Sequence, residues 1–236
     1  STYPTIDDGE LVDGDITIQT GATLTMTDSG HLRQLSGDFT LQGTIIINSE
    51  SELLINSSAT VTSANGTIIM RRYLDHEWHL IASPVTDQDI DAFVTNEVIA
   101  SGTGDNRGFA TYDTPNNAWT FYQNGASGTG NFVSGKGYSI KLATLDSDIE
   151  FTGKFVAIDK TIALTRGSTD NRSYNLIGNP YSAHINSGAI LDRSVSALVD
   201  KTIYLWDSEN SQYITKVAND TYSVAPGQSF FVRAAN

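Results

Sequence analysis

The chain has 236 residues, 39% hydrophobic and 17% charged, which is enough apolar side chain for one large β domain or two small ones and too little charge for a disordered chain. Its formal net charge of −13 argues against binding to nucleic acid and, by charge alone, to anionic membranes. The absence of Cys excludes disulfides, thiol catalysis and cysteine-type zinc sites. No apolar stretch approaches the ~20 residues of a membrane span, so we expect no membrane insertion. With no signal peptide visible, we interpret the sequence as a mature chain or a piece of a longer one.

Residues 1–70 consist of short β-branched runs separated by Gly, Asn, Ser or Asp, a pattern typical of strands and turns. The runs recur about every ten residues, which favours a short β-solenoid, a stack of rungs that buries a row of aliphatic side chains. A plain meander within a sandwich is the alternative. The expected interior residues are Ile16, Ile18, Leu24, Leu41, Ile45, Ile47, Leu54 and Val61.

From residue 71 onward the sequence contains an internal repeat. Three blocks recur in the same order at offsets of 96, 94 and 92 residues: EWHLIASPV (77–85) with SYNLIGNPY (173–181), TYDTPNNAWTF (111–121) with LWDSENSQYIT (205–215), and VSGKGYSI (133–140) with APGQSFFV (225–232). Order preserved across three blocks is hard to obtain by chance. We therefore expect one copy of a β unit over residues 71–165 and a second over 166–236, packed together as one domain.

The blocks predict the same series of elements in each copy. A strand with one buried face ends at a proline, which has no N–H for the ladder. A short helix follows, with candidates at 87–99 and 189–200. Next come a hairpin whose turn is held by Asp113 or Asp207 and a closing strand entered through Gly135 or Gly227. The predicted fold class is all-β, with a short β-solenoid-like N-terminal region followed by a duplicated β-sandwich-type unit.

These motifs resemble those of a known group of modules. RRYLDHEWHLIASPV, YNLIGNPY, YLWD and VAPGQSFFV are similar to segments of β-rich accessory modules in large secreted proteins of Bacteroidetes. Such modules often stand near the C-terminal sorting domain of type IX secretion substrates. The resemblance covers nearly the whole chain and implies a secreted or cell-surface location beside other domains of a parent chain. It implies no catalytic residue, and the sorting domain is not visible in this sequence.

One acidic segment has the residue types of a calcium site. Asp87, Asp89 and Asp91 place carboxylates at alternate positions, and oxygen ligands of this kind must converge on one ion. The alternative is a solvated loop that caps a helix, and the second copy keeps only Asn186 near the position of Asp91. Calcium is the only cofactor that the sequence suggests.

Several aromatic residues of the hairpins could stack on sugar rings. The candidates are Trp119, Tyr122 and Tyr112, with Trp206 and Tyr213 in the second copy, and Asn124 in the adjoining Gly-rich loop 122–132 as a polar partner. The alternative is that these rings form the cores of the two hairpins, because matched aromatics at matched positions are most simply explained by packing. Tyr122 has no aromatic counterpart, since residue 216 is Lys, which favours it for a role specific to one copy.

No motif indicates catalysis, so the chain is not expected to be an enzyme, and a polysaccharide-degrading enzyme is the least favoured of three hypotheses. The first hypothesis is a non-catalytic extracellular module with a structural or adhesive role in a secreted multidomain protein. The alternative is a carbohydrate-binding module attached to a polysaccharide-degrading enzyme, with a polysaccharide or cell-surface glycan as its partner.

Overall fold

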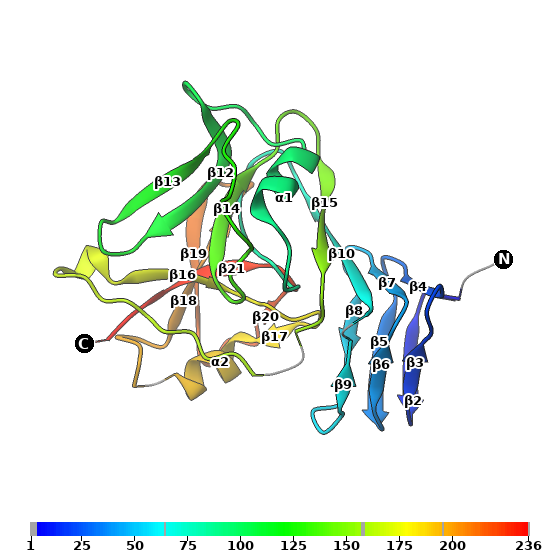
Figure 1. The fold of residues 1–236 in the computed structure, drawn as a ribbon. Helices are drawn as coiled ribbons and strands as arrows, with labels where there is room; N and C mark the ends of the chain where they lie inside the picture. The colour runs from blue at the N-terminus through cyan, green and yellow to red at the C-terminus, as the bar shows by residue number, and fades with distance from the viewer. Residues whose placement is uncertain (1–3, 64, 157–158, 195, 236) are drawn as a thin grey trace.

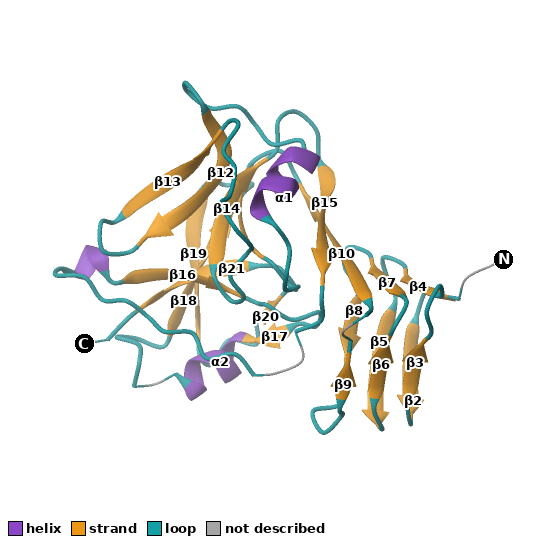
Figure 2. Cartoon of the chain, viewed as in Figure 1, coloured by secondary structure: helices purple, strands orange, loops and turns teal. Residues whose placement is uncertain are grey.

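A computed structural model describes residues 4–63, 65–156, 159–194 and 196–235. Strands dominate it (Figures 1 and 2), which confirms the all-β prediction. The helical elements are α1 (Ile90–Asn96), α2 (Ser187–Arg193) and a 3-10 turn, Asp170–Arg172. None of these described helical segments has the length and apolar content to cross a membrane.

The N-terminal part is a three-sided solenoid of parallel strands (Figure 1). One side contains β1 (Thr5–Ile6), β4 (Thr23–Met26), β7 (Thr44–Ile47) and β10 (Thr67–Leu74). The second contains β2 (Gly9–Asp13), β5 (His31–Ser36) and β8 (Glu52–Leu54). The third contains β3 (Ile16–Ile18), β6 (Phe39–Leu41) and β9 (Val61–Thr62).

The repeating unit of the solenoid is longer than the expected ten residues. Thr5 pairs with Thr25, Thr23 with Thr44, and Thr44 with Thr67, so successive rungs are offset by 20, 21 and 23 residues. The ten-residue spacing in the sequence corresponds to single strands with their turns. Each rung of the solenoid instead contains three strands, one for each side.

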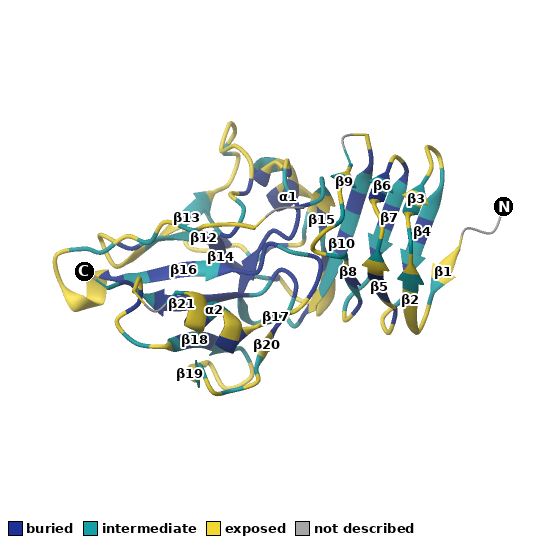
Figure 3. Ribbon diagram, turned by 90° about the horizontal axis from the view of Figure 1, so that it is seen from below, coloured by how far each residue is buried: buried dark blue, intermediate teal, exposed yellow. Residues whose placement is uncertain are grey.

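Side chains alternate between the interior and the surface along the solenoid strands (Figure 3). Seven of the eight expected interior residues contribute to the solenoid core: Leu24, Leu41, Ile45 and Ile47 are buried, and Ile16, Ile18 and Val61 are partly buried against them. The prediction that Leu54 faces the interior is wrong, because Leu54 is 41% exposed while its neighbour Leu53 is 1% exposed. A shift of one residue along a strand reverses the face.

Two four-stranded antiparallel sheets with the same strand order follow the solenoid, which confirms the duplicated unit. The first sheet has the order β11 (Trp78–Ala82), β14 (Gly137–Lys141), β12 (Asn106–Asp113) and β13 (Ala118–Gln123). The second has the order β16 (Tyr174–Gly178), β21 (Ser229–Arg233), β18 (Thr202–Asp207) and β19 (Gln212–Val217). A two-stranded ribbon in the second copy joins β17 (Ile185–Asn186) to β20 (Ser223–Val224).

The two sheets are joined by a pair of equivalent backbone contacts. Ile81 is bridged to Gln228, and Ile177 is bridged to Lys136 at the corresponding positions of the opposite copies. Between the sheets, Leu80, Leu176 and Phe231 form one buried cluster with several aromatic rings packed around it. The outer face of each sheet packs against its own helix, through Phe93 of α1 and Leu191 of α2.

The solenoid and the first β unit share one hydrophobic core. Strand β15 (Ser147–Gly153) of the first unit pairs antiparallel with β10 and so covers the end of the solenoid sheet. Strand β10 itself crosses the predicted boundary at residue 70. Near its end, the Arg72 guanidinium donates to the Gly227 carbonyl of the second copy at 2.6 Å and to the Leu80 carbonyl at 3.4 Å.

Candidate functional site: an aromatic pocket between the two β units

A pocket of about 310 Å³ lies where the two sheets meet. Its lining is mostly aromatic and comes from both copies: Trp78, His79, Leu80, Trp119, Phe121, Ser139, Trp206 and Tyr213. This volume is at the lower end of the range for small-molecule sites, which are concave and mainly apolar with a few polar groups.

The rings of the pocket are held by ordinary strand alternation. Trp119 and Phe121 are two residues apart on β13 and therefore point to the same face of the sheet. Trp78 lies 6.2 Å from Phe121 between ring centroids, and Trp206 lies 4.9 Å from Tyr213, both edge to face. Such edge-to-face pairs are favourable beyond the area they bury, so they fix the rings in place.

The pocket lies where the two copies of the repeat differ at a buried position. Ser139 of β14 corresponds to Phe231 of β21, 92 residues later. The Phe231 ring fills the space between the sheets on its own side, with centroids 4.9 Å from Tyr112 and 5.9 Å from Tyr213. On the other side the small Ser139 lines the pocket instead. A serine in place of a phenylalanine thus leaves one of two equivalent spaces open.

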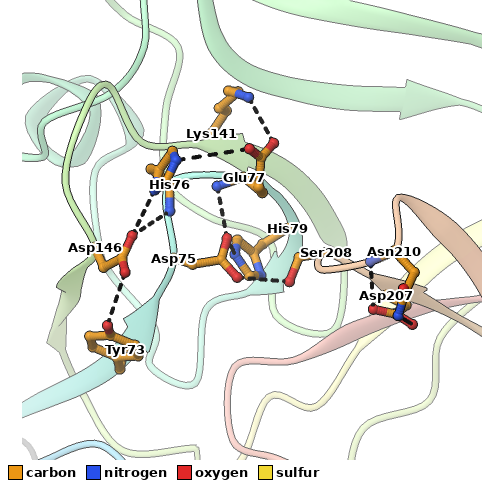
Figure 4. Close-up of polar contacts among 10 residues, drawn as sticks. All are labelled: Tyr73, Asp75, His76, Glu77, His79, Lys141, Asp146, Asp207, Ser208 and Asn210. Atoms are coloured by element: carbon orange, nitrogen blue, oxygen red, sulfur yellow. Dashed lines mark hydrogen bonds and ion pairs between the residues drawn. The ribbon is translucent and has the colours of Figure 1, made fainter.

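A polar network centred on Asp75 (Figure 4) adjoins the pocket through His79, which lines the pocket and bonds to Asp75, and we call this network the polar edge of the pocket. His79 Nε2 and Asp75 Oδ1 are 2.9 Å apart, and the Ser208 hydroxyl donates to Asp75 Oδ2 at 2.9 Å. The backbone N–H of Glu77 also donates to Asp75, at 2.8 Å. Since Ser208 belongs to the second copy, this carboxylate ties the two units together beside the aromatic rings.

Further ion pairs surround this network. Lys141 Nζ lies 3.0 Å from Glu77 Oε2. His76 contacts Asp146 at 2.8 Å, and the Tyr73 hydroxyl donates to the same carboxylate at 3.3 Å (Figure 4). Each acid near the pocket therefore has a nearby donor.

The protonation states follow from burial and hydrogen bonding. Burial lowers the pKa of His79, and its hydrogen bond with Asp75 only partly offsets this effect. Burial works against ionisation of Asp75, but donation from Glu77 N–H, His79 and Ser208 outweighs it and holds the Asp75 pKa below its ordinary value. At neutral pH the pair is therefore a neutral imidazole that donates to a carboxylate. An ionised carboxylate only accepts, so the His79 proton resides on Nε2 and Nδ1 is an acceptor.

The family model described as Domain of unknown function (DUF8693) matches residues 1–235. The chain belongs to this family. The match spans the solenoid and both β units, so the DUF8693 domain includes all three parts. Neither a search of curated proteins nor a search of solved structures finds a match.

In this DUF8693 chain the predicted aromatic residues separate into two groups. Trp119 lines the pocket, and Tyr112 packs against it at 5.2 Å between centroids while its hydroxyl donates to Asn117 at 2.6 Å. Tyr122 lies on the opposite face, against Phe109, and donates to Asp91 Oδ1 at 2.7 Å. Trp119 and Tyr122 therefore do not form one rim, because an odd spacing along a strand puts them on different faces.

Asn124 lies in the exposed turn after β13, where its backbone N–H donates to the Asp105 carbonyl at 2.6 Å. It is not among the residues that line the pocket. The loop that follows is connected to the helix side of the first unit, since the Thr129 N–H donates to Asp91 Oδ2 at 3.1 Å.

The three predicted calcium ligands do not converge in the DUF8693 structure. Asp89 caps α1, accepting from the Ala92 N–H at 2.8 Å, and Asp91 accepts from Tyr122 and Thr129. Asp87 and Asp89 line a second pocket of about 220 Å³ together with Glu97 and Glu150. Within the described ranges, no group of three His, Cys, Asp or Glu side chains is arranged to hold a metal ion.

Sequence reasoning did not select Trp78, His79, Phe121 or Ser139 as site residues, although they line the pocket of this DUF8693 domain. The signal that could have found them is the alignment of the two copies. It places Ser139 opposite Phe231 and Phe121 opposite Thr215. These are positions where the copies differ in size, and a difference in size inside a packed interface opens space.

Proposed function

We propose that the chain is a non-catalytic accessory module that binds carbohydrate in the aromatic pocket between its two β units. The observation that supports this most directly is the replacement of Phe231 by Ser139 at the equivalent position, which leaves a pocket lined with aromatic rings. In keeping with the resemblance described above, the module would belong to a secreted or cell-surface multidomain protein.

The chemistry of the pocket suits a sugar ring. A pyranose has faces of C–H groups and a periphery of hydroxyls. The faces pack against aromatic rings such as Trp78 and Trp119, which bury large area without losing many rotamers. The hydroxyls find His79 and Ser139 at the pocket and Asp75 beside it. Apolar rings with a few fixed polar groups are the usual composition of a small-molecule site.

The carboxylates near the pocket accept hydrogen bonds from the protein itself, which favours binding of a sugar over its hydrolysis. Glycoside hydrolysis uses two carboxyl groups that face the scissile bond from either side. Here Asp75 accepts three hydrogen bonds within the protein, and Asp207 accepts two from Asn210, at 3.2 and 2.9 Å. Both therefore serve the local structure of the β units.

A structural or adhesive role is the second candidate, favoured by a different observation. The core of the first unit is continuous with that of the solenoid, and β15 covers the solenoid end. A module whose solenoid and first β unit share one core would serve as a rigid spacer between domains of a parent protein. In that case the pocket would have no ligand.

Affinity electrophoresis distinguishes the two proposals. The purified chain is run through gels that contain β-glucan, galactomannan, xylan or galactan, and we expect at least one polymer to retard it. Ser139→Phe should abolish retardation, because it places in the pocket the side chain that fills the equivalent space in the second copy. Tyr122→Phe, on the opposite face of the sheet, is the matched control and should migrate as the wild type does.

Thermal melts accompany both variants to show that each remains folded. Retardation that survives in a folded Ser139→Phe variant would place binding elsewhere on the molecule. Migration of the wild type that none of the four polymers changes would leave the structural role as the better proposal.

A further inference from the structure

We infer that the pocket selects neutral polysaccharides and rejects those that carry uronate or sulfate groups. This inference rests on the proposed carbohydrate binding and names the class of ligand. It follows from the charges around the rings and from the direction of the hydrogen bonds at the polar edge.

The immediate surroundings of the pocket are acidic. In the part of the chain that the structure describes, neither Lys nor Arg lines the pocket. Glu77 directly precedes Trp78, Asp207 directly follows Trp206, and Asp75 bonds to His79. An anionic sugar entering here would bring its charge close to three carboxylates, and like charges in a partly desolvated site repel strongly.

Two cations lie next to pocket residues, and both are engaged. The Arg72 guanidinium donates to backbone carbonyls, one of them that of Leu80. Lys141 lies opposite Trp78 in the strand register, and its Nζ is 3.0 Å from Glu77 Oε2. Binding a carboxylate or sulfate through Lys141 would require breaking this ion pair. The positive charge of the lysine therefore offsets Glu77 instead of attracting an anion.

The polar edge also favours ligands that donate hydrogen bonds. His79 Nε2–H and the Ser208 hydroxyl both donate to Asp75, so these two donors are engaged. What remains there for a ligand is acceptor capacity on Asp75 and on His79 Nδ1. Sugar hydroxyls can donate to such atoms, whereas carboxylate and sulfate oxygens cannot. The remaining N–H and O–H groups of the lining, on Trp206 and Ser139 for example, are neutral and bring no positive charge to offset that of an anion.

The experiment compares each neutral polymer with its own oxidised form. Oxidation of the primary alcohols of β-glucan, galactomannan or galactan to carboxylates changes the charge and leaves the rest of the backbone as it was. In affinity gels at about 20 mM NaCl, we expect the polymer that retards the chain to bind at least ~10-fold more weakly after oxidation. At this salt concentration the repulsion between like charges is only weakly screened. At about 500 mM NaCl the difference should narrow, because salt screens partly exposed charges.

A local variant separates the pocket from the overall charge of the chain. Glu77→Gln removes one carboxylate and frees Lys141, so it should strengthen binding to the oxidised polymer severalfold and leave the neutral polymer nearly unaffected. Glu10→Gln makes the same change of charge on the exposed surface of the solenoid and should alter neither.

The outcomes distinguish this inference from the proposal beneath it. Equal or stronger retardation by the oxidised polymer would overturn the inference and leave carbohydrate binding in place. An equal gain in Glu10→Gln and Glu77→Gln would also overturn it, since the effect would then belong to the whole surface. If no neutral or oxidised polymer retards the chain, the proposed function itself is wrong.

Discussion

Asp89 and Asn186 cap the two helices of the repeat in the same way. The Asp89 side chain accepts a hydrogen bond from the Ala92 N–H at 2.8 Å, and the Asn186 side chain accepts one from the Ala189 N–H at 3.1 Å. Each capping residue is also paired with the equivalent part of its own copy, Asp89 with Asn131 and Asn186 with Ser223. The two residues are therefore structural counterparts, and the acidic side chain of the first copy has the role of an amide in the second.

Replacing each capping residue by the type found in the other copy should therefore change the stability of the fold very little. We expect Asp89→Asn and Asn186→Asp each to change the free energy of unfolding by less than about 0.5 kcal/mol, because Asn and Asp are comparable N-caps. Asp89→Ala and Asn186→Ala should each cost about 1 kcal/mol, since they remove the acceptor. Urea denaturation measures all four variants. A cost for Asp89→Asn as large as that for Asp89→Ala would mean that the charge of Asp89 matters for more than the cap.

The packing difference between Ser139 and Phe231 predicts unequal sensitivity to truncation. Phe231 is 6% exposed in the cluster between the sheets, where Leu80 and Leu176 are its buried neighbours. Phe231→Ala should lower the free energy of unfolding by about 3–5 kcal/mol, because it removes a large buried ring and leaves a cavity. Ser139→Ala at the equivalent position should stay within about 1 kcal/mol. Similar costs at the two positions would contradict the assignment of Phe231 as the side chain that fills the interface.

Glu52 should make the chain sensitive to acid. His184 donates to it from both Nδ1 and the backbone N–H, at 3.0 Å each. The side-chain bond from His184 is the main cause that lowers the pKa of Glu52 to about 2 from 4.5, against an opposing contribution from burial. Because the folded-state pKa is depressed, this stabilisation is present above pH 4.5 and is lost as the pH falls from 4.5 towards 2. Because Glu52 is partly exposed and solvent screens the interaction, we expect a stabilisation well below the ~3 kcal/mol that corresponds to the full pKa shift.

The measurement is the difference in free energy of unfolding between the wild type and Glu52→Gln over pH 2–7. The difference should shrink below pH 4.5, when the wild-type carboxylate takes up its proton. Glu10→Gln, on the exposed first rung, is the matched control and should show no such trend. A difference that does not vary with pH would show that Glu52 gains nothing from its ionised form.

Arg72 should contribute to the joint between the solenoid and the repeat. Its guanidinium donates to carbonyls of both β units, at Leu80 and Gly227. Arg72→Met keeps much of the side-chain length but removes these donors, and we expect a loss of about 1.5–3 kcal/mol, the usual value for hydrogen bonds to a charged group. Arg33→Met, at an exposed position of β5, should stay within about 0.5 kcal/mol. Equal effects of the two substitutions would contradict the proposed role of Arg72.

The fold could be predicted from the sequence where a local pattern determines the outcome. Period-two alternation with Gly and Asn turns identified the strands, and the three matched blocks identified the duplicated unit. The period of the solenoid could not be predicted as well, because one rung contains three similar pieces and each piece looks like a repeat. Leu53 and Leu54 show the same limit: two adjacent leucines give no sign of which one faces inward.

The candidate site depended on contacts between residues far apart in the sequence. Ser208 and Asp75 are 133 residues apart, and no local pattern connects them. Trp119 was selected as an aromatic candidate, but its neighbours in the pocket depend on how two sheets pack face to face. The capping residues were also misaligned by two positions, Asn186 with Asp91 in place of Asp89, because the loops before the helices differ in length between the copies.

The pairing of β10 with β15 has a consequence for the order in which the chain can fold. Arg71 of β10 and its partner Glu150 of β15 are 79 residues apart, and everything between them belongs to the first β unit. During synthesis the last solenoid strand emerges well before the strand that covers it, so its free backbone edge stays open to other chains in that interval. We therefore expect closure of the first β unit to protect the nascent chain from aggregation. Truncation between residues 75 and 147 should yield insoluble protein.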